Sequence, residues 1–251
     1  MQEFRDSLLL RYARSPPDLP SACDGCGKEC TVRHALACKV GGLVIRRHDE
    51  IRDVLIDIAS KVFPNAAIRD EPKIHTGRVA EEEKATEQTT NNVRRNFRKH
   101  KGEEERGDIL IRGLYANGTD CIIDVRVTDL DAKCDRNMDP EKILQKHERE
   151  KKKKYLQACL EQRRHFAPFV VSTDGMLGKE SKTLLKKLSS LLADKWEKPY
   201  HEVCGYVTAL MSIAIVRATH QCIRGSRVPT AYMSKRLPQW EDKAGLSLFR
   251  R

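Results

Sequence analysis

The runs Gly107-Asp108-Ile109-Leu110-Ile111 and Cys121-Ile122-Ile123-Asp124-Val125-Arg126-Val127 decide the fold. Both are rich in β-branched residues, and the turn signal Asn117-Gly118 lies between them. The sequence therefore predicts two strands joined as a hairpin. Asp108 opens the first strand and Asp124 lies within the second, so a hairpin would bring two carboxylates to one edge of a sheet.

Further helices and strands are predicted on both sides of this hairpin, which gives a mixed α/β (α+β) fold. Apolar residues recur on one face of residues 43–62 and predict a helix that ends before Phe63-Pro64. Residues 67–74 predict a short edge strand, because Pro72 is unsuited to a sheet centre. Asp139-Pro140 begins a charged helix that runs to about residue 164. A core strand at 166–172 and helices at 181–195 and 199–223 complete the pattern.

Composition indicates a polyanionic partner without choosing one. The 251 residues carry a formal net charge of +11, and lysine and arginine neutralise phosphates. Nucleic acid, a membrane surface or a ribosomal neighbour would fit this charge equally well. No run reaches the roughly 20 apolar residues that span a bilayer. The longest, residues 203–216, contains Gly, Thr and Ser and is interpreted as a buried core helix, so no membrane partner is expected.

A cluster of metal-ligand residues lies near the start of the chain. Three thiols and one imidazole fall within 16 residues with the spacing C-x2-C-x7-H-x3-C, which supplies a tetrahedral set for structural Zn2+. The four expected ligands are Cys23, Cys26, His34 and Cys38. Cys30 is a fifth candidate that would replace Cys26 or Cys38. Nine cysteines and the absence of a signal peptide indicate a reducing nucleus or cytosol.

The two aspartates have a functional and a structural interpretation. A carboxylate among isoleucines and valines is costly to bury unless a cation compensates its charge. Mg2+ held by Asp108 and Asp124 would activate water and offset charge on a scissile phosphate. In the structural interpretation, Asp108 caps a turn and Asp124 pairs with Arg126 or a helix lysine.

The helix after the hairpin offers cations suited to phosphodiester chemistry. Its run Lys151-Lys152-Lys153-Lys154-Tyr155 places Lys151 and Tyr155 on one face, four residues apart. A lysine near the metal would stabilise the charge of the pentacovalent phosphorus. At least two of the four lysines are expected only to face solvent.

These motifs resemble the C-terminal region of non-LTR retrotransposon polyproteins, which ends in a CCHC knuckle and a restriction-like endonuclease of the PD-(D/E)xK superfamily. The resemblance covers residues 23 to about 175. After the knuckle, Arg47-His48-Asp49-Glu50 is similar to the RHN helix motif of that family. Gly107-Asp108 stands for PD, Asp124-Val125-Arg126 for (D/E)xK, and Lys151 to Tyr155 for the lysine–tyrosine helix.

The resemblance implies a restriction-endonuclease-like αβββαβ core and assigns site residues with two departures. Gly107 replaces proline, and Arg126 replaces the lysine of the third motif. Arginine is a poor proton donor or acceptor because its pKa is very high. The resemblance therefore assigns the function of that lysine to a lysine of the next helix. Lys151 is the first choice and Lys154 the second, with Tyr155 beside them. Glu50 or Glu71 would add a third metal contact.

The expected organisation has four parts. They are an N-terminal helix and linker (1–22), the knuckle (23–40), the nuclease core with a polar insertion at 75–106 (41–177), and a basic helical C-terminal region (178–251). The N-terminal helix has no obvious partner for its apolar face, so the chain is interpreted as a C-terminal fragment or a degenerate copy.

The expected function is a Mg2+- or Mn2+-dependent endonuclease that nicks target DNA. The resemblance implies that the nick primes an associated reverse transcriptase, with element RNA as a further partner and the nucleus as the location. The main alternative is a non-enzymatic zinc module that binds nucleic acid while the carboxylates stay structural. A decayed element copy that folds without activity is a third reading.

Overall fold

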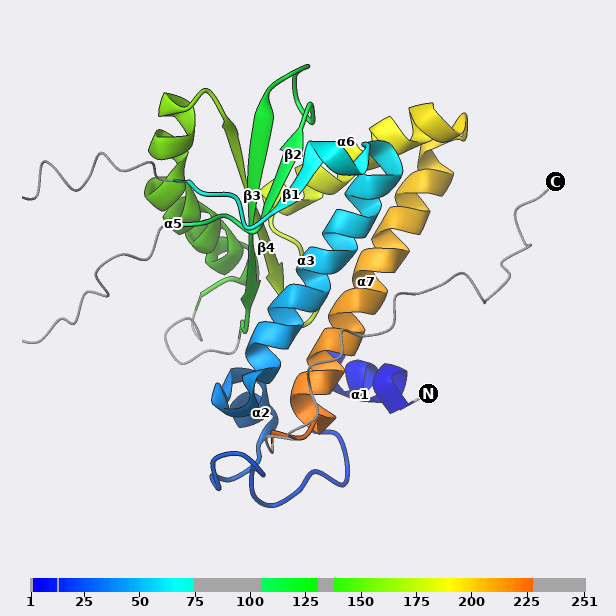
Figure 1. The fold of residues 1–251 in the computed structure, drawn as a ribbon. Helices are drawn as coiled ribbons and strands as arrows, with labels where there is room; N and C mark the ends of the chain where they lie inside the picture. Colours follow the sequence, from blue (N-terminus) through cyan, green and yellow to red (C-terminus); the bar gives the residue numbers. More distant parts are fainter. Residues whose placement is uncertain (1, 13, 75–104, 131–137, 228–251) are drawn as a thin grey trace, which may run out of the picture.

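A computed structural model describes residues 2–12, 14–74, 105–130 and 138–227, and one mixed sheet organises them (Figure 1). The four strands lie in the order β1-β2-β3-β4. Their bounds are Ile68–Asp70, Ile109–Arg112, Asp120–Thr128 and His165–Ser172. The helices are α1 Gln2–Arg11, α2 Val32–Ala37, α3 Leu43–Val62, α5 Pro140–Glu161, α6 Lys179–Trp196 and α7 Tyr200–Arg224. Short 3-10 turns occupy Val40–Gly42 and Asn65–Ala67.

The sheet combines an antiparallel hairpin with a parallel crossover. β2 pairs antiparallel with β1 and β3, and Ile109 lies opposite Ile123. β4 pairs parallel with β3, which requires a long connection, and α5 supplies it. Among the described residues, the helices and strands from α3 to β4 therefore follow the αβββαβ order that the sequence predicted.

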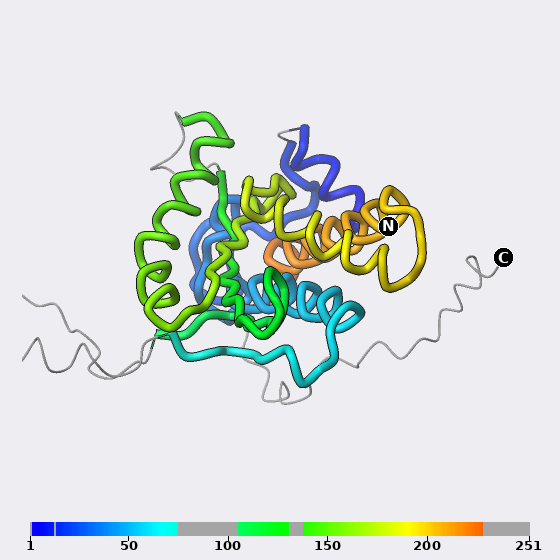
Figure 2. Tube along the Cα trace, turned by 90° about the horizontal axis from the view of Figure 1, so that it is seen from above, coloured from blue at the N-terminus to red at the C-terminus, as the bar shows by residue number. Residues whose placement is uncertain are grey.

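Two layers of helices cover the two faces of the sheet (Figure 2). α5 packs on one face, against β4 and β3. α3 and α6 pack on the other face, and α7 packs against both of them. Side chains alternate along a strand, so Ile123 and Val125 face α3 while Ile122 and Asp124 face α5. The aspartate of β3 therefore lies between the sheet and α5.

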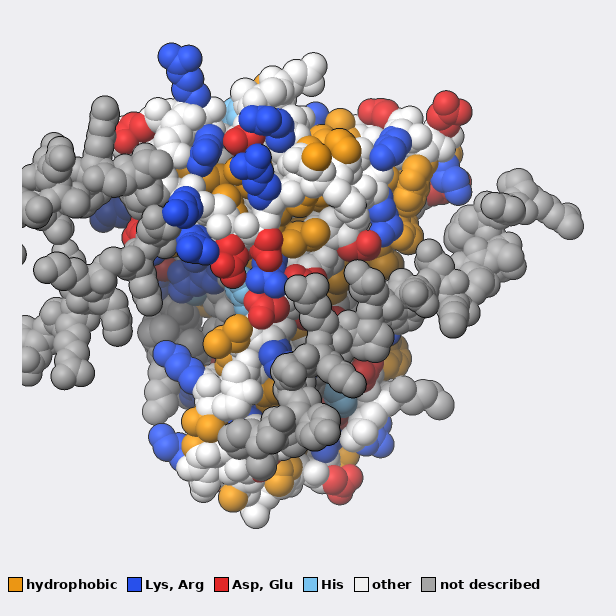
Figure 3. All heavy atoms as spheres, viewed as in Figure 1, with side chains coloured by type: hydrophobic (Ala, Val, Ile, Leu, Met, Phe, Trp, Pro, Cys, Tyr) orange, Lys and Arg blue, Asp and Glu red, His pale blue; other side chains and the backbone are white. Residues whose placement is uncertain are grey.

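Charged side chains are unevenly distributed on the face that Figure 3 shows. Lysine and arginine gather over the upper strands and the α5 side, and acidic side chains gather nearer the middle of this face. This distribution places positive charge on the same side of the molecule as α5.

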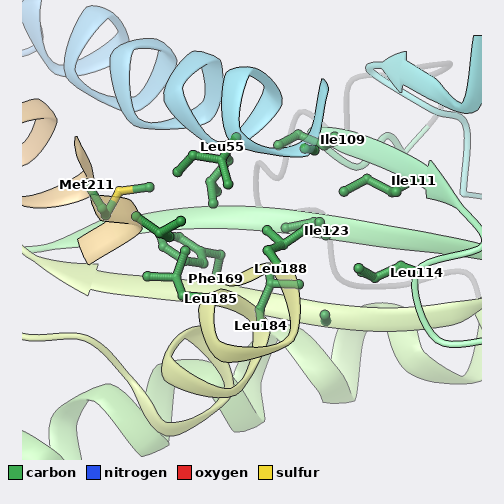
Figure 4. Packing of buried hydrophobic residues seen from close by; sticks show 14 of the residues in the cluster. Leu55, Ile109, Ile111, Leu114, Ile123, Phe169, Leu184, Leu185, Leu188 and Met211 are labelled. Carbon is green, nitrogen blue, oxygen red and sulfur yellow. The ribbon is translucent and has the colours of Figure 1, made fainter. Parts of the chain in front are cut away.

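The main core lies between the sheet and the layer of α3, α6 and α7 (Figure 4). Leu55 from α3, Phe169 from β4 and Leu188 from α6 point toward one another and are at most 1% exposed. Burial of apolar area drives this packing at roughly 25 cal/mol per Å². The core therefore fixes the sheet against α3, which carries His48 toward the start of β2.

α7 is the most apolar helix. By length and composition it could cross a membrane, whereas the sequence analysis expected no such segment. In the fold, Val207, Met211 and Ile215 lie in the main core and are at most 3% exposed. The interpretation of this segment as a core helix agrees with its packing on α3 and α6.

Most expected elements match the structure to within a few residues. α3 has the expected bounds, and Asp139 caps α5 by accepting a hydrogen bond from Glu141 N at 2.8 Å. The expected edge strand is shorter than predicted, because β1 ends at Asp70 and Glu71 adopts a φ of 46°. The expected insertion lies outside the described residues except for 105 and 106, as do residues 228–251.

The core makes a direct stability prediction. Leu55→Ala would remove a side chain that is 1% exposed, and we expect it to lower the free energy of unfolding by about 2–5 kcal/mol. Ile45→Ala, on the same helix but 66% exposed, should change it by less than about 0.5 kcal/mol. Urea unfolding followed by circular dichroism measures both. Equal losses would contradict the packing of α3 on the sheet.

Candidate functional site

A Cys3His cluster lies near the start of α3 and the end of α7, away from the sheet. The ligand atoms of Cys23, Cys26, His34 and Cys38 all lie within 4.8 Å of one another. Cys38 Sγ lies 3.9 Å from both Cys23 Sγ and Cys26 Sγ, and Cys26 Sγ lies 3.2 Å from His34 Nε2. Sulfurs around a tetrahedral zinc would be about 3.8 Å apart, given Zn–S bonds of roughly 2.3 Å. The cluster could therefore hold a structural zinc ion.

Local backbone geometry assembles this cluster. Cys23 N donates to Lys28 O at 2.7 Å, and the turn between them uses Gly27 at a φ of 72°. Thr31 caps α2 by accepting from His34 N at 3.1 Å, which turns His34 toward the cysteines. The Cys26 N–H points at the Cys23 sulfur, and together with Gly25 N–H and His34 it outweighs burial and lowers the pKa of Cys23 to about 6. A thiolate is the form that binds zinc.

Cys30 lies outside the four-residue cluster. It is buried, and its backbone N–H donates to Ser21 O at 3.1 Å. Among the described residues, the four ligands above are the only group of three or more His, Cys, Asp or Glu side chains with such close ligand atoms. The geometry therefore favours the expected set over either set that includes Cys30.

Arg227 anchors the cluster to the end of α7. Asp24 lies between two ligands and accepts from Arg227 N at 2.7 Å and from Ser226 Oγ at 2.8 Å. The guanidinium of Arg227, 2% exposed, donates to the carbonyls of Ala35 in α2 and Cys222 in α7. Gly41 permits this approach, because a Cβ there would lie 2.5 Å from Arg227 Cα.

The second candidate site lies where β2 begins beside the middle of β3. Asp108 lies one residue before β2, and its N–H donates to the carbonyl of Ile123, the residue before Asp124 in β3, at 3.0 Å. Asp108 Oδ2 also accepts from Val125 N at 2.6 Å. The hairpin thus brings the two predicted aspartates together.

Lys151 compensates the buried charge of Asp124. The Asp124 side chain is 7% exposed, and Lys151 Nζ from α5 lies 2.5 Å from its Oδ2. No well-aligned hydrogen bond from the described residues reaches that oxygen, so the contact is chiefly one of charge. Burial raises the pKa of the Asp124 carboxyl, and nearby Asp108 adds to the rise while Lys151 opposes it.

His48 reaches the same site from α3. Its Nε2 lies 3.2 Å from Asp108 Oδ2, and its Nδ1 lies 3.3 Å from Asp49 Oδ1. Burial disfavours the imidazolium, but Asp108 and Asp49 outweigh it and raise the pKa of His48. Each carboxylate therefore has one basic partner, Asp108 with His48 and Asp124 with Lys151.

The remaining basic candidates lie further from the carboxylates. Lys154 Nζ donates to Tyr155 Oη at 2.6 Å and lies 3.4 Å from Glu105 Oε1. Lys151 lies over the ring of Tyr155, 5.7 Å from its centroid, as their spacing on one face predicted. Arg126 bonds Glu150 at 2.7 Å on the surface. Of the two candidate lysines, Lys151 is the one in contact with an aspartate.

The structure does not bring either candidate glutamate to the carboxylates. Glu50 faces the opposite way along α3, where its charged neighbours include Arg217 of α7 and Glu3 of α1. Burial raises the pKa of Glu50 there, and Arg217 opposes that rise. Glu71 bonds Arg106 at 3.3 Å and is exposed. Glu50 lies two positions after His48, and about 200° of helical rotation turns their side chains apart.

Comparison with protein-family models and with curated proteins returns no match. Two residues that matter for these sites were not among the expected site residues, namely His48 at Asp108 and Arg227 at the cysteine cluster. The only sequence signal for His48 was its place in the Arg47-His48-Asp49-Glu50 motif. Arg227 carried no signal, because its partners lie about 200 residues earlier in the chain.

Metal content tests the ligand set. We expect the purified chain to hold about one zinc and Cys30→Ser to retain it, whereas Cys38→Ser should lose most of it because one of four ligands is gone. Elemental analysis after dialysis against a weak chelator gives the stoichiometry. Loss of zinc from Cys30→Ser with retention in Cys38→Ser would reverse the assignment.

Arg227 makes a second prediction. Arg227→Ala removes hydrogen bonds to Ala35 and Cys222, and we expect it to lower the free energy of unfolding by about 1–3 kcal/mol. Amide hydrogen exchange should accelerate in α2 and in the last turn of α7. Lys39→Ala, an exposed neighbour of the cluster, serves as the control. Exchange that is unchanged in Arg227→Ala would show that the anchor contributes little.

Proposed function

We propose that this protein is a divalent-metal-dependent endonuclease that nicks DNA. The observation that carries the proposal is the meeting of two carboxylates and one amine from three elements. Asp108 accepts a hydrogen bond from Val125 N, next to Asp124 in β3, and Lys151 Nζ of α5 lies 2.5 Å from Asp124. Acid, acid and lysine on a sheet edge beside a helix are the groups that metal-dependent phosphodiester hydrolysis requires.

The donor set suits a hard cation. Carboxylate oxygens are the protein ligands that Mg2+ and Mn2+ prefer, and Mg2+ usually binds through one or two of them. No hydrogen bond from the described residues reaches Oδ1 of Asp108, whose side chain is 21% exposed. When bound, the ion would lower the pKa of a water molecule and neutralise phosphate charge.

The protein groups have distinct roles in this proposal. Asp108 and Asp124 hold the cation, and Lys151 stabilises the negative charge that develops on the phosphorus oxygens. Water attacks phosphorus and the bond from phosphorus to the 3′ oxygen breaks, which leaves a 5′ phosphate and a protonated 3′ hydroxyl. Lys154 and Tyr155 support the position of Lys151 along α5. Arg126 takes no part, because Glu150 holds it on the surface.

The wider setting rests on the resemblance to non-LTR retrotransposon polyproteins. It is supported by the order αβββαβ, which matches that of the restriction-like endonuclease core, and by the zinc-type cluster that precedes α3. In this setting the 3′ hydroxyl primes the reverse transcriptase of the same polyprotein on chromosomal DNA in the nucleus. The net charge of +11 suits DNA and element RNA as partners.

A non-enzymatic nucleic-acid-binding module is the second candidate. The observation in its favour is that each aspartate already faces a basic side chain of the protein, Lys151 or His48. In that case the carboxylates would serve the fold alone, and a divalent ion would find no place beside them. Cleavage and metal dependence distinguish the two functions.

Plasmid nicking tests the proposal. With Mg2+ or Mn2+, the full chain should convert supercoiled plasmid to the open circle, and Asp108→Asn or Asp124→Asn should lower the rate by about 100-fold or more. Asp129→Asn, just beyond β3, should keep the rate. Nicking that survives both aspartate variants would identify a contaminating nuclease and refute the site.

Lys151 makes a separate kinetic prediction. Lys151→Met keeps the aliphatic stem but removes the charge next to Asp124, so the rate of nicking should fall more than DNA affinity. Lys153→Met, exposed on the same helix, should leave the rate unchanged. Single-turnover rates and filter binding give the two quantities. A loss of affinity alone would make Lys151 a phosphate-binding residue.

A further inference from the structure

His48 touches the candidate metal site from the side opposite to Lys151. It projects from α3, whereas Lys151 projects from α5, and the two reach different aspartates. The His48 side chain is 29% exposed, so the contact borders solvent instead of lying in the core. The polar contacts of His48 are those with the carboxylates of Asp108 and Asp49.

The contact of His48 occupies one particular oxygen of Asp108. Oδ2 accepts from Val125 N at 2.6 Å and faces His48 Nε2 at 3.2 Å. A carboxylate oxygen has two lone pairs, so these two donors use the capacity of Oδ2. A cation could then approach Asp108 through Oδ1 without displacing either donor. The backbone donor alone would leave one lone pair of Oδ2 open.

His48 is itself held in its orientation. Its second ring nitrogen, Nδ1, lies 3.3 Å from Asp49 Oδ1, and Arg52 NH1 lies 3.2 Å from that same Asp49 oxygen. The chain from Arg52 through Asp49 to His48 fixes both edges of the imidazole. An imidazole bound at both nitrogens can act as a rigid support for a carboxylate.

We infer that His48 is a positioning residue that holds Asp108 as a one-oxygen ligand for a divalent cation. The inference rests on the proposed function and adds a residue to it. His48 binds Oδ2 and fixes the torsion of the carboxylate, so that Oδ1 would be left to bind a cation together with Asp124. Without His48, the carboxylate of Asp108 is held by Val125 N alone and rotates more freely.

The test compares His48→Ala with His48→Gln in the full chain. Gln keeps an N–H donor at about the reach of Nε2, whereas Ala removes it. Mn2+ binding, followed by electron paramagnetic resonance without DNA, should weaken about 10- to 100-fold in His48→Ala and recover most of that loss in His48→Gln. Asp57→Ala, exposed on α3 and paired with Lys61 there, is the control and should bind Mn2+ like the wild type.

Thermal unfolding separates positioning from a structural role. Zinc content and the midpoint of unfolding should be equal in the wild type and His48→Gln. Unchanged Mn2+ affinity in His48→Ala would overturn the inference while the nuclease proposal stands on Asp108 and Asp124. Equal loss of affinity in both His48 variants, with a lowered midpoint, would also overturn it. Mn2+ binding by the wild type that survives Asp108→Asn would refute both the inference and the metal site.

Discussion

The contact between Lys151 and Asp124 is the constraint on which the packing of α5 on the sheet depends. A carboxylate that is 93% buried in a central strand requires a cation close to it, because desolvation of an unpaired charge is costly. The parallel pairing of β3 and β4 requires a crossover, and the helix that makes it, α5, carries that cation over the aspartate. The topology of the sheet and the electrostatics of the site are therefore satisfied by the same helix.

The two candidate metal sites are held by different means. The carboxylate site draws on four elements, with α3, β2, β3 and α5 each contributing a polar group. The cysteine cluster comes from one short stretch of chain, whose own core is small. Buried Arg47 and Arg227 compensate for this by donating to the carbonyls of Leu36 and Ala35 in α2, which fixes the cluster against α3 and α7. A zinc ion bound in the cluster would act together with these arginines in place of the apolar core that such a short segment lacks.

Sequence reasoning was most effective where periodicity and covalent neighbours decide the structure. The bounds of α3, the hairpin with its two aspartates and the ligand spacing of the cluster are all local patterns. Sequence reasoning failed where tertiary contacts determine the position of a side chain. Glu50 and His48 are two residues apart on one helix, and only the packing of α3 shows which one faces Asp108. Pro72 and the left-handed Glu71 shorten β1 in a way that composition alone underestimates.

The bond between Asp24 and Arg227 has a mechanical consequence. It joins positions about 200 residues apart, and Asp24 lies between two of the candidate zinc ligands in the sequence, so the end of α7 is bonded directly to the segment that carries them. Tension applied to the chain at Arg227 would reach the sulfurs before it reached the sheet. A neighbour tethered to that end would therefore strain the small cysteine-rich lobe first.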